Sequence, residues 1–279
     1  MKINKNSLQA RIKNLSTQKS VSPNIILQEF FFDAFLKRLA KSKYKDNFVF
    51  KGGFLLSATL GIEFRSTMDM DFLFKNLAFS KENVIGIVKE IIEEDVEDNV
   101  SFDFDSVRDI RSDDQYGGYN INLIARLENI KVPVSVDIAT GDPITPSSIV
   151  YSYRCLFSDD VLNFNSYNFE TILAEKLHTV LNREENNSRS KDFYDIYIIQ
   201  KLRFNEIDLK QLKQAFKNTC NHRGFDITKE KALDIVNKIK HDDKMIIRWN
   251  SYVRKNKFTS GISFAETISA VENLLSIIF

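Results

Sequence analysis

The amino-acid sequence predicts an α+β fold, in which a small mixed sheet with helices is followed by a helical C-terminal region. Two observations predict it. Short apolar segments of strand length, separated by turn residues, fill much of residues 46–150. From about residue 170, apolar residues recur at helical spacing to the end of the chain. We therefore expect an N-terminal helical segment at 1–45, an α/β core at 46–150 and a helical region at 151–279.

Caps and turn residues set the bounds of the expected elements. Ser22-Pro23 is typical of a helix start, and Gly61 of a helix end. Helices are expected at 25–39, 54–60, 80–92, 170–184, 191–203, 207–221, 228–240, 243–256 and 264–278. Strands are expected at 48–50 and 68–74, followed by an antiparallel meander of 100–110, 118–129 and 132–140.

The composition is that of a packed protein. Phe is abundant (23) and Gly scarce (9) among the 279 residues, which argues against disorder. No apolar run approaches the ~20 residues that a membrane span needs, and no apolar core follows the basic N-terminus as it would in a signal peptide. Cys155 and Cys220 are too few and too isolated for a disulfide framework. We expect a cytoplasmic protein with no membrane partner.

The net charge of +1 conceals three charged segments. Residues 1–45 carry ten Lys and Arg against two Asp and Glu, residues 90–114 carry eleven Asp and Glu against two Arg, and residues 229–257 carry nine Lys and Arg against four Asp and Glu. The two basic ends could flank a site for a polyanion. Solvated helix faces explain either basic segment equally well. The pattern therefore permits a nucleic-acid partner without requiring one.

Two carboxylates lie in a hydrophobic run of strand length. Because side chains two apart on a strand share a face, Asp69 and Asp71 would project together, with Met68, Met70 and Phe72 packed beneath. Two carboxylates on one rigid face can hold Mg²⁺, a hard cation that takes oxygen ligands and substrate phosphates. The alternative is a structural Asp at a strand end, although a buried pair without a ligand would be costly.

A Gly-Gly pair precedes this strand. Gly52 and Gly53 let the backbone come close to a phosphate without a Cβ in the way. If a short helix opens at Phe54, its free N–H groups would face that phosphate. The neighbouring Lys51 could be only a surface charge.

Three groups of residues then follow one another along the chain: Gly52-Gly53 with Arg65-Ser66-Thr67 and Asp69-Met70-Asp71, then Ala174-Glu175-Lys176-Leu177, then Arg189, Lys191-Asp192 and Asp195. In this order they resemble the motifs of the AbiEii toxin family, part of the nucleotidyltransferase superfamily with the DNA polymerase β fold. The matches span roughly residues 50–200. The gap between Gly53 and Asp69 is longer than in the superfamily at large.

The resemblance implies a nucleotidyltransferase-like sheet and an active site to which the helical C-terminal region contributes. The catalytic residues that it implies are Asp69, Asp71, Asp137, Lys176 and Asp192. Those implied to bind the nucleotide are Gly52, Gly53, Arg65, Thr67, Arg189 and Lys191. Mg²⁺ would be held by Asp69, Asp71 and Asp137.

Three of these residues also have plainer interpretations. Asp137, in an alternating strand, would be the third carboxylate and could accept the proton of an attacking hydroxyl, or it could be a strand-end Asp bonded to the next turn. Lys176, beside an apolar helix face, would contact triphosphate or simply snorkel. Asp192 would orient a lysine or only complement a helix N-terminus.

The function implied is that of a Mg²⁺-dependent nucleotidyltransferase toxin of a bacterial abortive-infection or toxin–antitoxin system, acting in phage defence. It would transfer nucleotides from a nucleoside triphosphate to RNA, in known family cases the 3′ end of tRNA, and would have a cognate antitoxin. Two alternatives stay open: nucleotidyl or phosphoryl transfer to a protein, and a non-catalytic nucleotide-binding or RNA-binding module.

Overall fold

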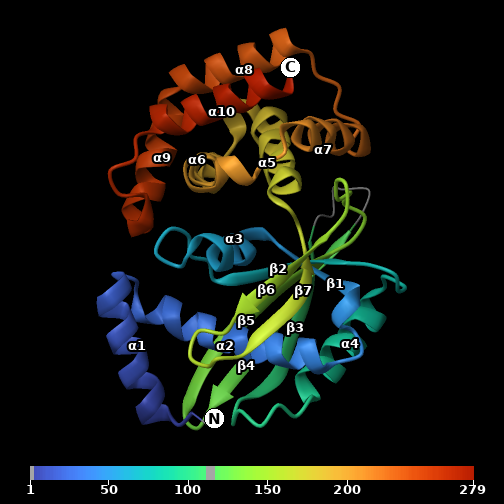
Figure 1. The fold of residues 1–279 in the computed structure, drawn as a ribbon, viewed down its shortest axis with the longest axis vertical. Coiled ribbons are helices and arrows are strands. Elements are labelled where there is room, and N and C mark those ends of the chain that lie inside the picture. The colour runs from blue at the N-terminus through green and yellow to red at the C-terminus, as the bar shows by residue number, and fades with distance from the viewer. Residues whose placement is uncertain (1–2, 111–116) are drawn as a thin grey trace. The chain divides into compact units, whose positions relative to one another are not determined.

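The computed structural model describes residues 3–110 and 117–279 and confirms the α+β fold (Figure 1). The chain forms two compact units. The sheet unit comprises Met1–Asp142 and Ile149–Ser166, and the helical unit comprises Pro143–Ser148 and Tyr167–Phe279. Among the helices described, none is long and apolar enough to cross a membrane.

One seven-stranded sheet organises the sheet unit, with strand order β3-β4-β5-β2-β1-β7-β6. The strands are β1 Phe48–Lys51, β2 Asp69–Phe74, β3 Ser101–Ile110, β4 Gly118–Leu127, β5 Ile130–Ala139, β6 Ile149–Arg154 and β7 Val161–Ser166. The β2–β5 and β1–β7 pairs are parallel and the other pairs antiparallel, so the sheet is mixed, as predicted. The antiparallel meander of β3, β4 and β5 is also confirmed.

An aromatic core joins one face of the sheet to its helices. The helices of this unit are α1 Lys5–Lys19, α2 Pro23–Lys41, α3 Gly52–Leu60 and α4 Lys81–Glu93. On α2, Phe32 contacts Phe54 and Phe35 contacts Phe72, and Phe50 of β1 stacks on Phe72 with 5.6 Å between ring centroids. All five rings are almost fully buried. Because Met70 and Phe72 point into this core, the alternate residues of β2 project from the opposite face.

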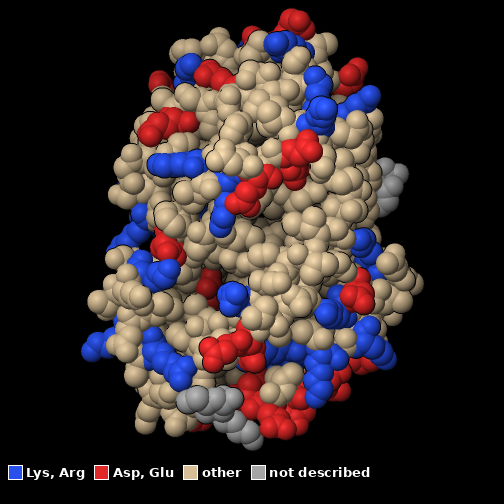
Figure 2. Space-filling view, viewed as in Figure 1, with Lys and Arg blue, Asp and Glu red and all other residues tan. Residues whose placement is uncertain are grey.

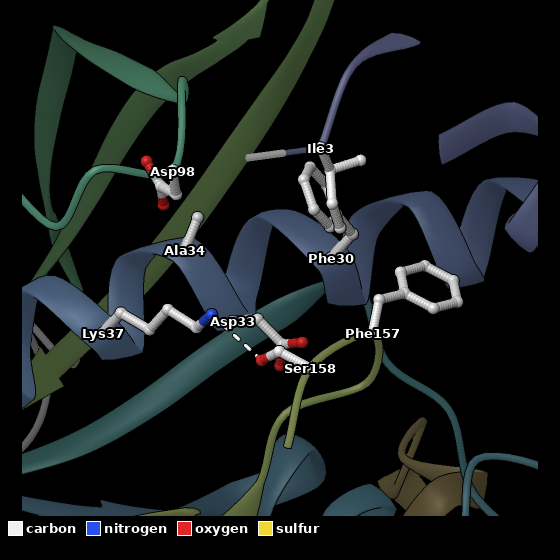
Figure 3. Close-up of a pocket in the computed structure, with 8 residues that line it drawn as sticks. All are labelled: Ile3, Phe30, Asp33, Ala34, Lys37, Asp98, Phe157 and Ser158. Atoms are coloured by element: carbon white, nitrogen blue, oxygen red, sulfur yellow. Dashed lines mark hydrogen bonds between the residues drawn. The ribbon is translucent and has the colours of Figure 1, made fainter. Parts of the chain in front are cut away.

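The same helix α2 carries two buried acids. Glu29 accepts a hydrogen bond from Ser57 at 2.7 Å, and burial raises its pKa to about 8. Burial likewise raises the pKa of Asp33 to about 7, although the Tyr153 hydroxyl and the Leu156 N–H donate to its carboxylate. Asp33 is one of the residues that line a small cavity of about 30 Å³. Figure 3 shows these residues, with Lys37 reaching Ser158.

Six helices make up most of the helical unit: α5 Phe169–Arg183, α6 Ser190–Arg203, α7 Leu209–His222, α8 Lys229–His241, α9 Asp243–Lys255 and α10 Phe264–Ile278. Each lies within two residues of its predicted bounds. Side chains of Asn168, Asp208, Thr228 and Ser263 cap helix N-termini, which explains why the sequence located them well.

The segment Pro143–Ser148 belongs to the helical unit although it precedes two strands of the sheet. Its Thr145 is held there by three side chains. Asn168 Nδ2 donates to the Thr145 carbonyl at 2.7 Å, and Asn218 Nδ2 donates to the Thr145 hydroxyl at 2.9 Å. The Thr145 N–H donates to the Thr171 hydroxyl at 3.1 Å.

The hairpin β6–β7 lies partly in the range 151–279, where the sequence indicated helices. It completes the sheet, because β7 pairs in parallel with β1 from more than a hundred residues earlier in the chain. Likewise, α1 and α2 belong to the sheet unit and do not form a separate segment. The observed division therefore differs from boundaries at 45/46 and 150/151.

Candidate active site

Polar residues form a row across four neighbouring strands. Asp71 of β2 lies opposite Lys51 of β1 and Asp137 of β5, and Asn120 of β4 lies opposite Asp137. Residues directly opposite in adjacent strands share a face of the sheet. Asp69, two residues before Asp71, shares it as well. The structure thus places the three candidate metal ligands on one sheet face.

Of the three residues predicted to pack beneath these carboxylates, two are buried and one is exposed. Met70 and Phe72 are fully buried, as predicted. The prediction for Met68 is wrong, because 54% of this residue is exposed. The strand begins only at Asp69, so Met68 lies before the pleat that directs alternate side chains into the core.

The Gly-Gly turn closes directly over Asp71. The Gly53 N–H donates to Asp71 Oδ2 at 3.3 Å. Gly52 has φ +70°, and a Cβ at this position would lie 2.0 Å from the same oxygen. Only glycine can satisfy both the backbone conformation and this approach. Helix α3 begins at Gly52, two residues before the predicted position, so its N-terminal N–H groups lie at the carboxylate.

The residues between the two motifs pack against this turn. A Cβ on Gly53 would lie 3.1 Å from both Arg65 Nη2 and Thr67 Oγ1. Thr67 Oγ1 donates to Asp69 Oδ1. Arg65 is 4% exposed and donates to the Ser66 carbonyl. Four of the predicted nucleotide-binding residues therefore gather around the two aspartates.

Lys51 is a buried ion-pair partner and not a surface charge. It is 6% exposed, and its Nζ lies 2.8 Å from Asp142 Oδ2. The two residues are 91 positions apart in the sequence. The contact depends on the sheet bringing them together, so no local pattern predicts it.

Asn120 is a site residue that sequence analysis missed. Its Nδ2 donates to Asp137 Oδ1 and, at 2.6 Å, to Ser135 Oγ. A signal was present, because Asn120 and Asn122 alternate with apolar residues in a predicted strand of the meander. Polar side chains at alternate positions indicate one polar sheet face.

The donor set suits a hard cation. Carboxylate oxygens on one face, next to a turn without Cβ atoms, are what Mg²⁺ takes when phosphate and water supply its remaining ligands. Within the part of the chain that the structure describes, no group of three or more His, Cys, Asp or Glu side chains is preassembled for a metal ion.

In the helical unit, the later motifs form one charged cluster between α5 and α6. Lys176 Nζ lies 2.6 Å from Asp195 Oδ2 and 3.2 Å from Asp192 Oδ1. Arg189 Nε lies 2.8 Å from Asp192 Oδ2. The Asp192 and Asp195 side chains are 2% and 0% exposed, and that of Lys176 is 13% exposed. Lys191 is half-buried in the first turn of α6.

Farther along α5, His178 is buried in its neutral form. Burial, with a smaller effect of Arg223, lowers its pKa to about 4. The Arg223 Nη1 lies 3.3 Å from His178 Nδ1, and Phe225 packs edge-on against the imidazole.

The basic C-terminal segment is partly committed to the fold of the helical unit. Arg248 donates to the Glu185 carbonyl at 2.7 Å, and Lys240 pairs with Glu272 at 3.0 Å. Figure 2 shows acidic and basic side chains next to one another over much of the face in view. These contacts favour a structural role for part of the positive charge at 229–257. Of the acidic segment 90–114, residues 111–114 lie outside the described residues.

The mixed sheet has carboxylates opposite one another on β2 and β5 and a glycine turn over them, which is the arrangement that the sequence resemblance to nucleotidyltransferases implies. Residues 34–269 match the family model described as nucleotidyl transferase AbiEii toxin of a type IV toxin–antitoxin system. The chain therefore belongs to the AbiEii nucleotidyltransferase toxin family.

Two solved structures from Helicobacter pylori are similar in fold. The structure of JHP933 is 18% identical, covers 92% of this chain and 93% of its own, and superposes with a TM-score of 0.55. A structure described as a candidate nucleotidyltransferase is 17% identical, covers 92% of this chain and 96% of its own, and has a TM-score of 0.54. No curated protein matches the sequence.

Proposed function

We propose that this AbiEii-family enzyme transfers a nucleotide from a nucleoside triphosphate to RNA in a Mg²⁺-dependent reaction, with the 3′ end of tRNA as the acceptor. One observation carries the proposal. Asp71 and Asp137 lie opposite each other on a sheet face, and the Gly53 N–H at the start of α3 reaches Asp71. Carboxylates for a cation and N–H groups for a phosphate therefore meet at one position.

The residues of the sheet unit would have three roles: binding the metal ion, binding phosphate and accepting a proton. Asp69, Asp71 and Asp137 would hold Mg²⁺, which when bound offsets charge on the α-phosphate and on the leaving pyrophosphate. The N-terminal N–H groups of α3 would bind phosphate oxygens, and the missing Cβ at Gly52 leaves room for the Asp71 carboxylate. Asp137 would accept the proton of the attacking hydroxyl.

In the helical unit, Lys176 would act on the triphosphate as a point charge. Asp192 and Asp195 hold its ammonium group in place, at 3.2 and 2.6 Å. Arg189, whose side chain is 44% exposed, would supply a second positive charge. Such electrostatic positioning accounts for most of the catalysis in transfers of this type.

Membership of a toxin–antitoxin family supports two further parts of the proposal. The protein has a cognate antitoxin, and it acts in the cytoplasm in defence against phage.

Incubation with total RNA and total protein, using each nucleoside triphosphate labelled in turn at the α- or γ-phosphate, tests the function. We expect α-label in RNA, in the size range of tRNA. Label in protein would overturn the RNA acceptor, with γ-label indicating phosphoryl transfer and α-label nucleotidyl transfer. No label in either fraction, from a folded protein, would favour the non-catalytic module.

A further inference from the structure

We propose that Asn120 is a positioning residue for metal binding, because it fixes the carboxylate of Asp137 through an uncharged hydrogen bond. The inference rests on the proposed function, in which Asp137 is a metal ligand. Asn120 is 2% exposed and lies directly opposite Asp137 on the neighbouring antiparallel strand.

The orientation of the Asn120 amide follows from its partners. An ionised carboxylate can only accept hydrogen bonds, so the amide nitrogen must face Asp137 Oδ1. The second N–H of the same nitrogen reaches Ser135 Oγ at 2.6 Å. Both donors of the amide are thus used on β5, two residues apart along one strand.

The carbonyl end of Asn120 is held from the other side. Asn122 Nδ2 donates to Asn120 Oδ1 at 3.1 Å and to Ser106 Oγ on β3 at 3.3 Å. The network therefore extends from β3 through β4 to Asp137. A side chain held at both ends loses its rotamer freedom before any ligand binds.

A bulge in β3 determines which residue supports this network. Phe104 lies opposite Leu123, but the register then shifts, so that Ser106 and not Asp105 lies opposite Asn122. A β-bulge redirects side chains in this way. The shift supplies a neutral hydroxyl where a regular ladder would have placed another carboxylate close to the row.

The neutrality of Asn120 matters for cation binding. A Lys or Arg at this position would hold Asp137 equally well but would repel a metal ion. An amide orients the carboxylate and leaves its negative charge in place. Partners that orient metal ligands in this way typically contribute 10–100-fold to metal affinity or activity.

Titration of the purified full chain with Mn²⁺, with free Mn²⁺ measured by electron paramagnetic resonance, tests the inference. We expect the dissociation constant to rise about 10–100-fold in Asn120→Ala and in the similarly shaped Asn120→Leu. The control is Asn165→Ala, an asparagine of β7, which should bind Mn²⁺ as the wild type does. Excess metal should restore the transfer rate of the Asn120 variants, which loss of packing alone would not allow.

Asp69→Ala separates this inference from the proposed function. If Asp69→Ala abolishes Mn²⁺ binding but both Asn120 variants bind like the wild type, Asn120 does not position the ligand and the metal site stands. If Asp69→Ala binds like the wild type, the metal site itself is wrong. Should both Asn120 variants unfold, Asn122→Ala must still raise the dissociation constant, by less than about 10-fold. An unchanged value there would overturn the inference.

Discussion

In the sheet unit, the donors that reach the candidate carboxylates include three neutral groups: the Thr67 hydroxyl, the Gly53 N–H and the Asn120 amide. In the helical unit, Lys176 is instead bound directly to two buried carboxylates, Asp192 and Asp195. Hydrogen bonds from neutral groups orient an acid without adding a charge, whereas an ion pair places a positive charge next to it. The comparison teaches that neutral donors orient carboxylates on the sheet face, while buried ion pairs orient Lys176 in the helical cluster.

The largest expected effect is a loss of nucleotide transfer, and it tests the carboxylates of the sheet unit. Asp69→Ala or Asp71→Ala should lower nucleotide transfer at least about 10³-fold while keeping the fold, because each removes a carboxylate that is repelled by its neighbour without a cation. Growth inhibition on expression should vanish too. Labelled-nucleotide assays and circular dichroism check this. The matched control is Asp103→Ala, an exposed carboxylate of β3, and full toxicity of the two site variants would refute the metal site.

A second prediction concerns the helical cluster. Lys176→Met should lower kcat/KM for the triphosphate about 10²–10³-fold and leave RNA affinity nearly unchanged. It should also destabilise the protein by about 3–5 kcal/mol, because the charges of Asp192 and Asp195 stay buried without it. These two effects need to be separated.

The double variant Lys176→Met with Asp195→Asn separates them, because it removes one charge of each sign. We expect it to recover most of the lost stability in thermal unfolding and none of the lost triphosphate use. If kcat/KM returns together with stability, Lys176 has only a structural role.

The smallest expected effect concerns the pH dependence of stability, which we expect to differ between the two units. Glu29 and Asp33 have raised pKa values, about 8 and 7, so their contribution to stability is present at low pH and is lost as the pH rises through those values. His178 has a pKa lowered to about 4, so its contribution is present above its ordinary value of 6.5 and is lost as the pH falls toward 4. The two units should therefore weaken at opposite ends of the pH range.

Hydrogen exchange, corrected for intrinsic rates, can follow α2 and α5 separately. Between pH 6 and pH 8 the protection of α2 should fall by about 3–4 kcal/mol, and Glu29→Gln should reduce that loss. His178→Gln should reduce the loss of protection of α5 between pH 6 and pH 4. Loss of protection in both helices at the same end of the range would contradict the comparison.

Much of this molecule could be predicted from local sequence. The helices from residue 169 onward have caps and regular apolar spacing, and β2 is an apolar run in which two aspartates alternate. The roles assigned to the site residues by the family resemblance stay predictions. Their placement shows only that Asp69, Asp71 and Asp137 share a face and that Lys176 meets Asp192.

What local sequence could not predict depends on partners distant in the chain. The ion pair of Lys51 with Asp142 spans 91 residues, and the contact of Arg248 with the Glu185 carbonyl spans 63. The hairpin β6–β7 has a strand partner only once β1 is in place. Asn120 meets Asp137 through the register of two strands, which a one-residue shift would undo.

The chain passes between its two units more than once, which limits where it can be cut into separate pieces. The backbone crosses between them three times, after Asp142, Ser148 and Ser166. A reading frame that stops at residue 166 would complete the sheet but leave Thr145 without its three partners, and a product that starts at residue 167 would lack Thr145 altogether. Neither unit is therefore one uninterrupted stretch of the sequence, and a cut between residues 166 and 167 separates Thr145 from the side chains that hold it.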